Sequence, residues 1–255
     1  MFRPRIIPTL LLSGRGIVKT VQFRHPRYLG DPINTVRIFS SKGADELLLL
    51  DIRATLENTR PPASLVSQIS DESFMPLAVG GGVREVEDVR ALLNAGAEKV
   101  VINTRAIESP GLVREAADLF GSQSVVGSID ASNEGGHGYR VFTHAGSRKT
   151  KRDPVEVARE LEAAGAGEIM ITSIERDGTM EGYDLDLIQR ITSAVSVPVI
   201  ASGGAGSLDH FRQAIQKANA SAVAAGSFFV YHGKRRAVLI SYPTRREVET
   251  ALGDL

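Results

Sequence analysis

An internal repeat is the feature that most constrains the fold of this chain. The stretch "GADELLLLDI", starting at Gly43, matches "GAGEIMITSI", starting at Gly165. Likewise "MPLAVGGGV", with its proline at 76, matches "VPVIASGGA", with its proline at 198. Both pairs are separated by 122 residues (165 − 43 and 198 − 76). The two halves of the chain are therefore expected to form the same supersecondary unit and to pack against each other.

Short apolar runs alternate with amphipathic stretches along the chain. Because the runs are apolar nearly throughout, they are typical of parallel strands that are buried on both faces. Several amphipathic stretches begin with Asp or Ser and end with Gly, as capped helices do. The predicted strands are 5–12, 46–52, 75–81, 99–103, 124–130, 168–174, 197–204 and 222–227, and the clearest helices are 31–43, 85–96, 109–121, 153–165 and 184–195.

Eight strands that alternate with helices predict an α/β fold, a single (β/α)8 TIM barrel built from two repeated half-barrels. A doubly wound open sheet is the alternative, and the repeat favours the barrel. The chain contains no linker and no low-complexity segment, so residues 1–255 are interpreted as one domain.

Composition excludes several classes of protein. The 30 basic side chains balance the 30 acidic ones, which argues against a nucleic-acid or membrane-binding surface. No apolar run reaches the roughly 18–20 residues that span a bilayer, and the N-terminal "MFRPRIIP" has no signal-peptide core. The absence of cysteine excludes disulfides, thiolate metal sites and a cysteine nucleophile. Since the histidines show no metal-ligand spacing either, we expect a soluble cytoplasmic protein without metal or other cofactor.

In barrels of this kind, ligands bind at the C-terminal ends of the strands, here called the mouth. The predicted strands 75–81 and 197–204 both end in glycine-rich loops. Backbone N–H groups in such loops can approach an anion closely, and the helix that follows adds to the attraction. Two phosphate sites are therefore predicted, although the glycines could instead only make tight turns. The first site comprises Gly81, Gly82, Asn103 and Thr104, and the second comprises Gly203, Gly204, Gly226 and Ser227.

Asp130 closes an apolar strand at the mouth and is the predicted catalytic acid or base. A carboxyl group in apolar surroundings resists ionisation, which suits it to proton transfer near neutral pH. Asp51 and Asp177 are explained equally well by backbone capping or by orientation of a loop. Further polar residues predicted at the mouth are Thr172 and Ser202. Asp177 and Gly178, in the turn "ERDGT", are predicted to bind the substrate or its phosphate.

Charged residues stand out in two other places. The long basic segment 13–31 follows the first strand, and Lys19 within it has the reach to cover the mouth as part of a lid. An ordinary solvated loop explains the same pattern equally well. At the opposite end of the barrel, four predicted strands begin with a charge of alternating sign. These residues, Arg5, Glu46, Lys99 and Glu168, are expected to form ion pairs that close the barrel, and the pattern alone favours this stabilising role.

Seven motifs resemble the cyclase subunit of imidazole glycerol phosphate synthase, the HisF type of histidine biosynthesis, over roughly residues 3–230. They are "RIIP", "DELLLLDI", "VGGGV", "INT", "FGSQSVVGSIDAS", "GAGEIMITSIERDGTMEGYD" and "PVIASGGAGS". The resemblance implies that ammonia from a HisH-like glutaminase enters at the barrel bottom and travels through the core. At the mouth it would react with a ribulosyl aminoimidazole carboxamide nucleotide, which carries a phosphate at each end. It also implies that the four charged strand starts form an ammonia gate.

The resemblance breaks at one catalytic position. Two aspartates carry the acid–base chemistry of that family, and Asp130 matches the second. The first falls on Leu11, because "RIIPTLL" stands where the family pattern has "RIIPCLD". Leucine exchanges no proton, so loss of this partner would weaken the cyclase reaction.

Leu11 and the stretches 226–243 and 25–39 resemble a different branch, the HisF-like paralogues of surface-polysaccharide clusters. Those work with a HisH-like glutaminase and a sugar amidotransferase to convert an N-acetyl group to an acetamidino group. Three hypotheses follow: an ammonia-conducting synthase subunit for acetamidino sugars, a true cyclase of the lyase class, and a non-catalytic barrel that only activates a glutaminase. In the first two, a phosphorylated small molecule is the expected ligand of the mouth.

Overall fold

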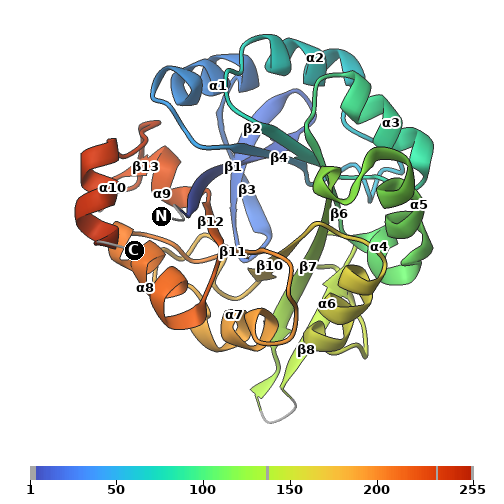
Figure 1. Cartoon of the computed structure of the whole chain (residues 1–255). Helices are drawn as coiled ribbons and strands as arrows, with labels where there is room; N and C mark the ends of the chain where they lie inside the picture. Colours follow the sequence, from blue (N-terminus) through green and yellow to red (C-terminus); the bar gives the residue numbers. More distant parts are fainter. Residues whose placement is uncertain (1–3, 136–137, 234, 254–255) are drawn as a thin grey trace.

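The computed structural model describes residues 4–135, 138–233 and 235–253. Within these ranges the predicted barrel is confirmed: parallel strands form a central ring, and helices surround it (Figure 1). The barrel strands are β1 (Arg5–Ser13), β4 (Leu47–Asp51), β5 (Leu77–Gly80), β6 (Lys99–Ile102), β7 (Val125–Asn133), β10 (Glu168–Ser173), β11 (Val199–Ser202) and β12 (Ala222–Ala225).

The ring is closed. β1 pairs in parallel with both β12 and β4, and β7 pairs in parallel with β10, so that each barrel strand has two neighbours. This closure excludes the open doubly wound sheet. It also brings the C-terminal ends of all the strands to one opening, where a barrel of this type holds its ligands.

Helices cover the outside of the ring. They are α1 (Pro32–Ser41), α2 (Ala63–Asp71), α3 (Val86–Asn94), α4 (Thr104–Glu108), α5 (Gly111–Phe120), α6 (Pro154–Ala163), α7 (Leu185–Thr192), α8 (Leu208–Ala218), α9 (Ser227–Val230) and α10 (Arg245–Leu252), with a 3₁₀ turn, η1, at Ser122–Ser124. Asp31, Asp153 and Asp184 cap α1, α6 and α7 through their side chains, as the sequence predicts. Among the described helices, none combines the length and apolar character that crossing a bilayer requires.

The described residues also contain short antiparallel strand pairs outside the ring, which were not predicted. They are β2 (Gly16–Val21) with β3 (Arg24–Gly30), β8 (Tyr139–Thr143) with β9 (Arg148–Lys149), and β13 (Tyr231–His232) with β14 (Ala237–Val238). The segment 13–31 is thus a β-hairpin that extends from β1 and not an irregular loop. Most of β3 is exposed, so its sequence lacks the apolar pattern by which a buried strand is recognised.

Apolar side chains fill two separate compartments. The larger lies between the strands and the helices. The smaller, here called the apolar belt, lies inside the ring and comprises Ile7, Leu48, Ala78, Val101, Val126, Met170, Ile200, Ala222 and Ala224. Because successive side chains of a strand point to opposite faces, each strand supplies both compartments, which explains the nearly continuous apolar runs.

Candidate active site

A cavity of about 300 Å³ opens at the mouth of the barrel, and most of the predicted site residues line it. Both predicted catalytic side chains line it, as does Leu11. Because these residues come from strands and loops that are distant in sequence, only closure of the ring brings them together. The predicted site residues on its wall are Lys19, Asp51, Gly81, Asn103, Thr104, Asp130, Thr172, Asp177, Gly178, Ser202, Gly203, Gly204, Gly226 and Ser227.

Asp130 is held at the end of β7 and faces this cavity. Its Oδ2 accepts a hydrogen bond from Nδ2 of Asn103 at 3.2 Å, and Thr172 lies beside it in the strand register. Burial raises the pKa of Asp130 from 3.8 to about 7, and the negative charge of Asp177 adds to this, while hydrogen bonds from Thr172 and Asn103 lower the pKa. A carboxyl group with a pKa near neutrality can both take up and release a proton at physiological pH.

The raised pKa of Asp130 has a consequence for stability. Between pH 4 and 7 the folded chain keeps this proton while the unfolded chain, with an ordinary pKa of 3.8, releases it. Folding stability from this group is therefore lost as the pH rises through that interval. Asp130→Asn should match the wild type near pH 4 and exceed it at pH 8 by up to about 4 kcal/mol, less what water in the cavity screens. Urea unfolding at both pH values measures the difference, and an equal difference at both would contradict it.

Leu11 lines the same cavity as Asp130, at the end of β1. Its backbone pairs with Leu50 of β4 on one side and with Val18 of β2 on the other. Ile7, two alternations earlier on the same strand, belongs to the apolar belt, so Leu11 lies on the face of β1 that points into the barrel. An apolar side chain therefore stands at the mouth where the related pattern carries the first of its two aspartates.

Lys19 joins the hairpin β2–β3 to the loop that follows β10. Its Nζ donates to the Asp177 carboxylate at 2.9 and 3.2 Å and to the Thr20 carbonyl at 2.9 Å, and its side chain is almost fully buried. The hydroxyl of Thr20 and the backbone N–H of Gln22 also donate to Asp177. Of the roles that the sequence left open for Asp177, these contacts support orientation of the loops. They also hold the hairpin at the mouth.

Gly178 and Gly226 permit this arrangement. At Gly178, which has φ of 74°, a Cβ atom would lie 2.4 Å from the carbonyl oxygen of Thr20. At Gly226 a Cβ atom would lie 3.0 Å from Cε of Lys19. A larger residue at Gly178 would push the hairpin backbone away from the mouth, whereas one at Gly226 would press on the flexible end of the Lys19 side chain. Both glycines therefore have a packing reason that is independent of any ligand, and that of Gly178 is the stronger.

The first glycine loop leads into a second cavity of about 590 Å³, which shares Gly81, Asn103 and Thr104 with the mouth. Gly81 and Gly82 both have positive φ, and the backbone N–H of Gly82 already donates to the hydroxyl of Thr55 at 3.3 Å. Sequence reasoning missed three groups that line this cavity: Arg84, Arg105 and His144. Arg84 could have been found, because only Val83 separates it from the glycine run.

The second glycine loop is tightly packed against its surroundings. A Cβ atom at Gly204 would lie 2.2 Å from the carbonyl of Gly182, and one at Gly203 would lie 2.6 Å from the carbonyl of Ser173. Close backbone packing therefore explains these two glycines without an anion. The hydroxyl of Ser227 is buried and has no hydrogen-bond partner in the described part of the chain. Phosphate binding at both loops stays a prediction.

Asp51 caps the turn that follows β4. Its Oδ1 accepts hydrogen bonds from the backbone N–H groups of Arg53 at 2.9 Å and Ala54 at 3.0 Å. Burial raises the pKa of Asp51, and these two hydrogen bonds oppose the rise. Of the two roles that the sequence left open for Asp51, the contacts support capping.

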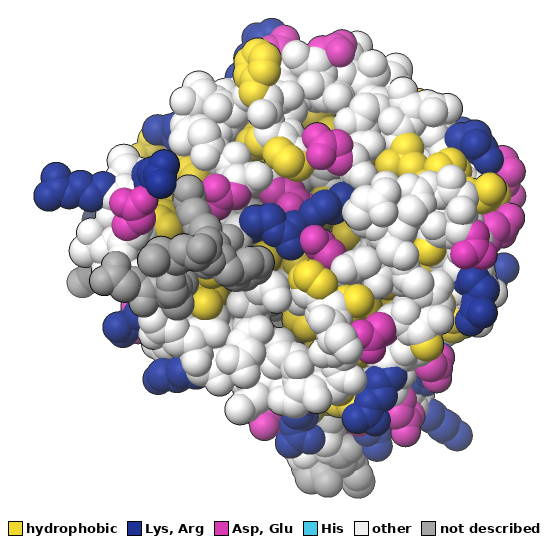
Figure 2. Space-filling model, viewed as in Figure 1, with side chains coloured by type: hydrophobic (Ala, Val, Ile, Leu, Met, Phe, Trp, Pro, Cys, Tyr) yellow, Lys and Arg dark blue, Asp and Glu magenta, His cyan; other side chains and the backbone are white. Residues whose placement is uncertain are grey.

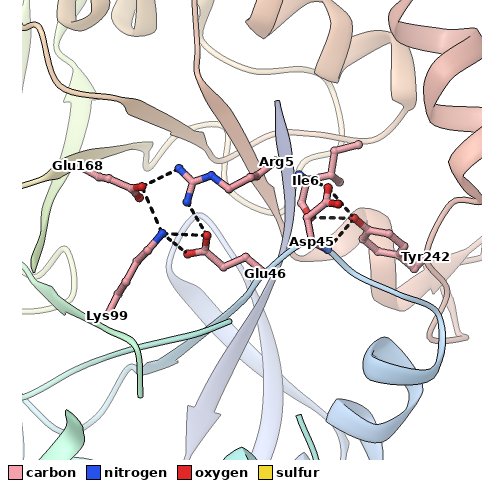
Figure 3. A network of polar contacts seen from close by, with 7 residues as sticks. All are labelled: Arg5, Ile6, Asp45, Glu46, Lys99, Glu168 and Tyr242. Carbon is pink, nitrogen blue, oxygen red and sulfur yellow. Dashed lines mark hydrogen bonds and ion pairs between the residues drawn. The ribbon is translucent and has the colours of Figure 1, made fainter. Parts of the chain in front are cut away.

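At the opposite end of the barrel, Arg5, Glu46, Lys99 and Glu168 form a closed set of contacts, here called the charged ring (Figure 3). Lys99 Nζ lies 3.0 Å from Glu46 and 3.2 Å from Glu168, and Arg5 contacts both glutamates, Glu168 at 2.8 Å. The Glu46 side chain is 3% exposed. In the view of Figure 2, basic and acidic side chains gather at the centre of this face. The ion pairs predicted between strand starts are thus formed.

Comparison with known proteins agrees with this geometry. The family model described as "Histidine biosynthesis protein" matches residues 5–236. A Pseudomonas aeruginosa protein named "Putative imidazole glycerol phosphate synthase subunit hisF2" is 52% identical over 95% of this chain and 97% of its own length. Proteins of Leptospira borgpetersenii and Leptospira interrogans, both named "Putative imidazole glycerol phosphate synthase subunit HisF", are 45% and 44% identical, each over 98% of both chains. The chain therefore belongs to the family of HisF-type imidazole glycerol phosphate synthase subunits.

Proposed function

We propose that this chain is the ammonia-using synthase subunit of a two-component glutamine amidotransferase. The observation that carries the proposal is the order in which charged and apolar side chains follow one another along the barrel axis. A charged ring closes one end, an apolar belt follows it, and the mouth cavity with Asp130 opens at the other end. This order suits a path on which ammonia enters at the ring and reacts at the mouth.

The apolar belt supports passage of neutral ammonia. Moving an ammonium ion through surroundings such as Ile7, Leu48 and Met170 would cost far more free energy than moving uncharged NH₃, because no charge or hydrogen-bond partner replaces its water. A glutaminase of the HisH type, docked on the face that carries the charged ring, would supply ammonia directly to this path. The names of the relatives support such a partner.

At the mouth, three groups have roles in the proposed reaction. Asp130 moves the proton, since its pKa lies near 7. Lys19, held by Asp177, covers the acceptor and keeps water out. The two glycine loops hold the phosphates of a phosphorylated small molecule through backbone N–H groups.

Two acceptors are candidates. The names of the relatives favour the ribulosyl aminoimidazole carboxamide nucleotide, which a cyclase would convert to imidazole glycerol phosphate and an aminoimidazole carboxamide ribotide. Leu11 favours the second candidate, in which the barrel delivers ammonia to a sugar amidotransferase that makes an acetamidino group for a surface polysaccharide. With Leu11 facing the cavity in place of the family's first aspartate, cyclisation lacks a proton carrier, whereas delivery of ammonia needs none there.

The test mixes the purified chain with its glutaminase and glutamine, once with the ribulosyl nucleotide and once with an N-acetylated sugar nucleotide plus the sugar amidotransferase. Product that forms only when the barrel is present is the expected result, and the arm that yields it identifies the acceptor. If omission of the barrel changes neither arm, the proposal fails. Activation of the glutaminase that survives both Asp130→Asn and a blocked path, with no product in either arm, would instead show a non-catalytic scaffold.

A further inference from the structure

We propose that Tyr242, in the C-terminal segment, is a positioning residue for the charged ring. Its hydroxyl group fixes the chain segment that carries Glu46, and so sets the ion pairs that ammonia must pass. This inference rests on the function proposed above and adds a residue to the ammonia path that lies outside the barrel strands.

Glu46 lies just outside regular structure. β4 begins at Leu47, and its ladder with β1 runs from the pair Thr9–Leu48 to the pair Leu12–Asp51. The two residues of each of these pairs are 39 positions apart in the sequence. Ile6 and Asp45 are also 39 positions apart, so they lie where the ladder would continue toward the N-terminal ends of the two strands. Before the pair Thr9–Leu48, however, side chains join the two segments.

Tyr242 and Asp45 supply that junction (Figure 3). The Asp45 carboxylate accepts a hydrogen bond from the backbone N–H of Ile6 at 3.0 Å. The Tyr242 hydroxyl lies 3.0 Å from the Ile6 carbonyl and 3.3 Å from the Asp45 carboxylate, and it accepts from the backbone N–H of Asp45 at 3.3 Å. One hydroxyl therefore holds the main chain of both segments.

The residues held in this way are the direct neighbours of two ring members. Ile6 follows Arg5, and Asp45 precedes Glu46. Arg5 has a second attachment, because its backbone also pairs with Ala222 of β12. Glu46 precedes its strand, so its position depends more strongly on the Asp45 main chain, and Glu46 contacts both cations of the ring.

The ring of Tyr242 is itself fixed by the core. It stacks on Phe229 with 5.5 Å between centroids and 16° between planes, and Phe229 is 1% exposed. The backbone N–H of Ser241 donates to the Phe229 carbonyl at 2.8 Å. Because packing sets the ring, removal of the hydroxyl alone leaves the aromatic contact in place and isolates the polar contribution.

The experiment compares Tyr242→Phe with Tyr183→Phe in the full-length chain. Tyr183 is a matched control, since its buried hydroxyl also donates to a backbone carbonyl, that of Ala224 at 2.9 Å, without contacting a neighbour of the ring. Both variants lose a hydrogen bond and should lower the melting temperature by roughly 2–4 °C. The first readout is the ¹⁵N–¹H signal of the Lys99 ammonium group, assigned with Lys99→Met, which ion pairing protects from exchange with water.

The expected result is a Lys99 signal that persists in the wild type and in Tyr183→Phe but is broadened or lost in Tyr242→Phe. With the glutaminase bound, glutamine-dependent turnover should fall about tenfold relative to ammonia-dependent turnover in Tyr242→Phe only, the fold-change that loss of one hydrogen bond can supply. Identical Lys99 signals in the two variants, or equal losses, would overturn the inference. Because the NMR readout needs neither partner nor acceptor, a wild type that transfers no ammonia would count against the proposed function and leave this test intact.

Discussion

Replacing Asp130 with asparagine is expected to lower ammonia-dependent turnover of the acceptor by about 10²–10⁴-fold, the usual loss when a positioned acid or base is removed. Asparagine keeps the size and the hydrogen bond to Asn103 but cannot exchange a proton. Ammonium salt supplied directly, without glutaminase, isolates the step at the mouth. The kcat measured across pH should show an inflection near 7 in the wild type, where Asp130 titrates, and none in the variant.

Asp51→Asn is the matched control for this prediction. Asp51 is also a partly buried carboxyl group at the mouth with a pKa raised by burial, but its contacts are the backbone N–H groups of Arg53 and Ala54. Its replacement should weaken the turn and lower stability while leaving kcat within a few-fold. A turnover of Asp130→Asn within twofold of the wild type would remove Asp130 from the catalytic machinery.

Leu11→Asp is expected to produce or increase turnover of the ribulosyl nucleotide, by up to about 10²–10⁴-fold if the rest of the mouth is competent. The new carboxyl group would line the cavity that already holds Asp130. Two carboxyl groups in one apolar site share a proton, so their pKa values should move apart and the variant should lose stability as the pH rises above 7. Product formation from ammonia and the ribulosyl nucleotide measures the gain.

Leu11→Asn separates proton exchange from polarity, because it has the same size as aspartate and no titrating group. Gain with Leu11→Asp and none with Leu11→Asn would show that the missing acid is what limits cyclisation here. A well-folded Leu11→Asp without any gain would show that the mouth differs from a cyclase at further positions. That result would count against the ribulosyl nucleotide as the acceptor of ammonia. It would favour the other candidate, in which the barrel delivers ammonia to a sugar amidotransferase.

The barrel was predictable from the sequence because its signal is local and repeated. Strands buried on both faces appear as apolar runs, such as 46–52 and 168–174, and their repetition at one offset favours a closed ring. The hairpin β2–β3 was not predictable as strands, because β3 is mostly exposed and carries no apolar alternation. Residues at the two ends of the strands could be predicted to lie at one opening or the other, because in a parallel barrel all C-terminal strand ends face the mouth and all N-terminal ends face the opposite opening.

Contacts between those residues were decided by the tertiary structure alone. The sequence predicted that Asp130 and Asp177 lie near the mouth and that four charges begin the strands, and it left open whether Lys19 reaches the mouth. Only the folded chain pairs Lys19 with Asp177, 158 residues away. It also leaves Asp130 without an ion pair among the described residues and with a pKa near 7. It also places Tyr242 against Ile6, 236 residues away. Such partners depend on closure of the ring and on the low dielectric of a packed interior, which no local pattern of residues encodes.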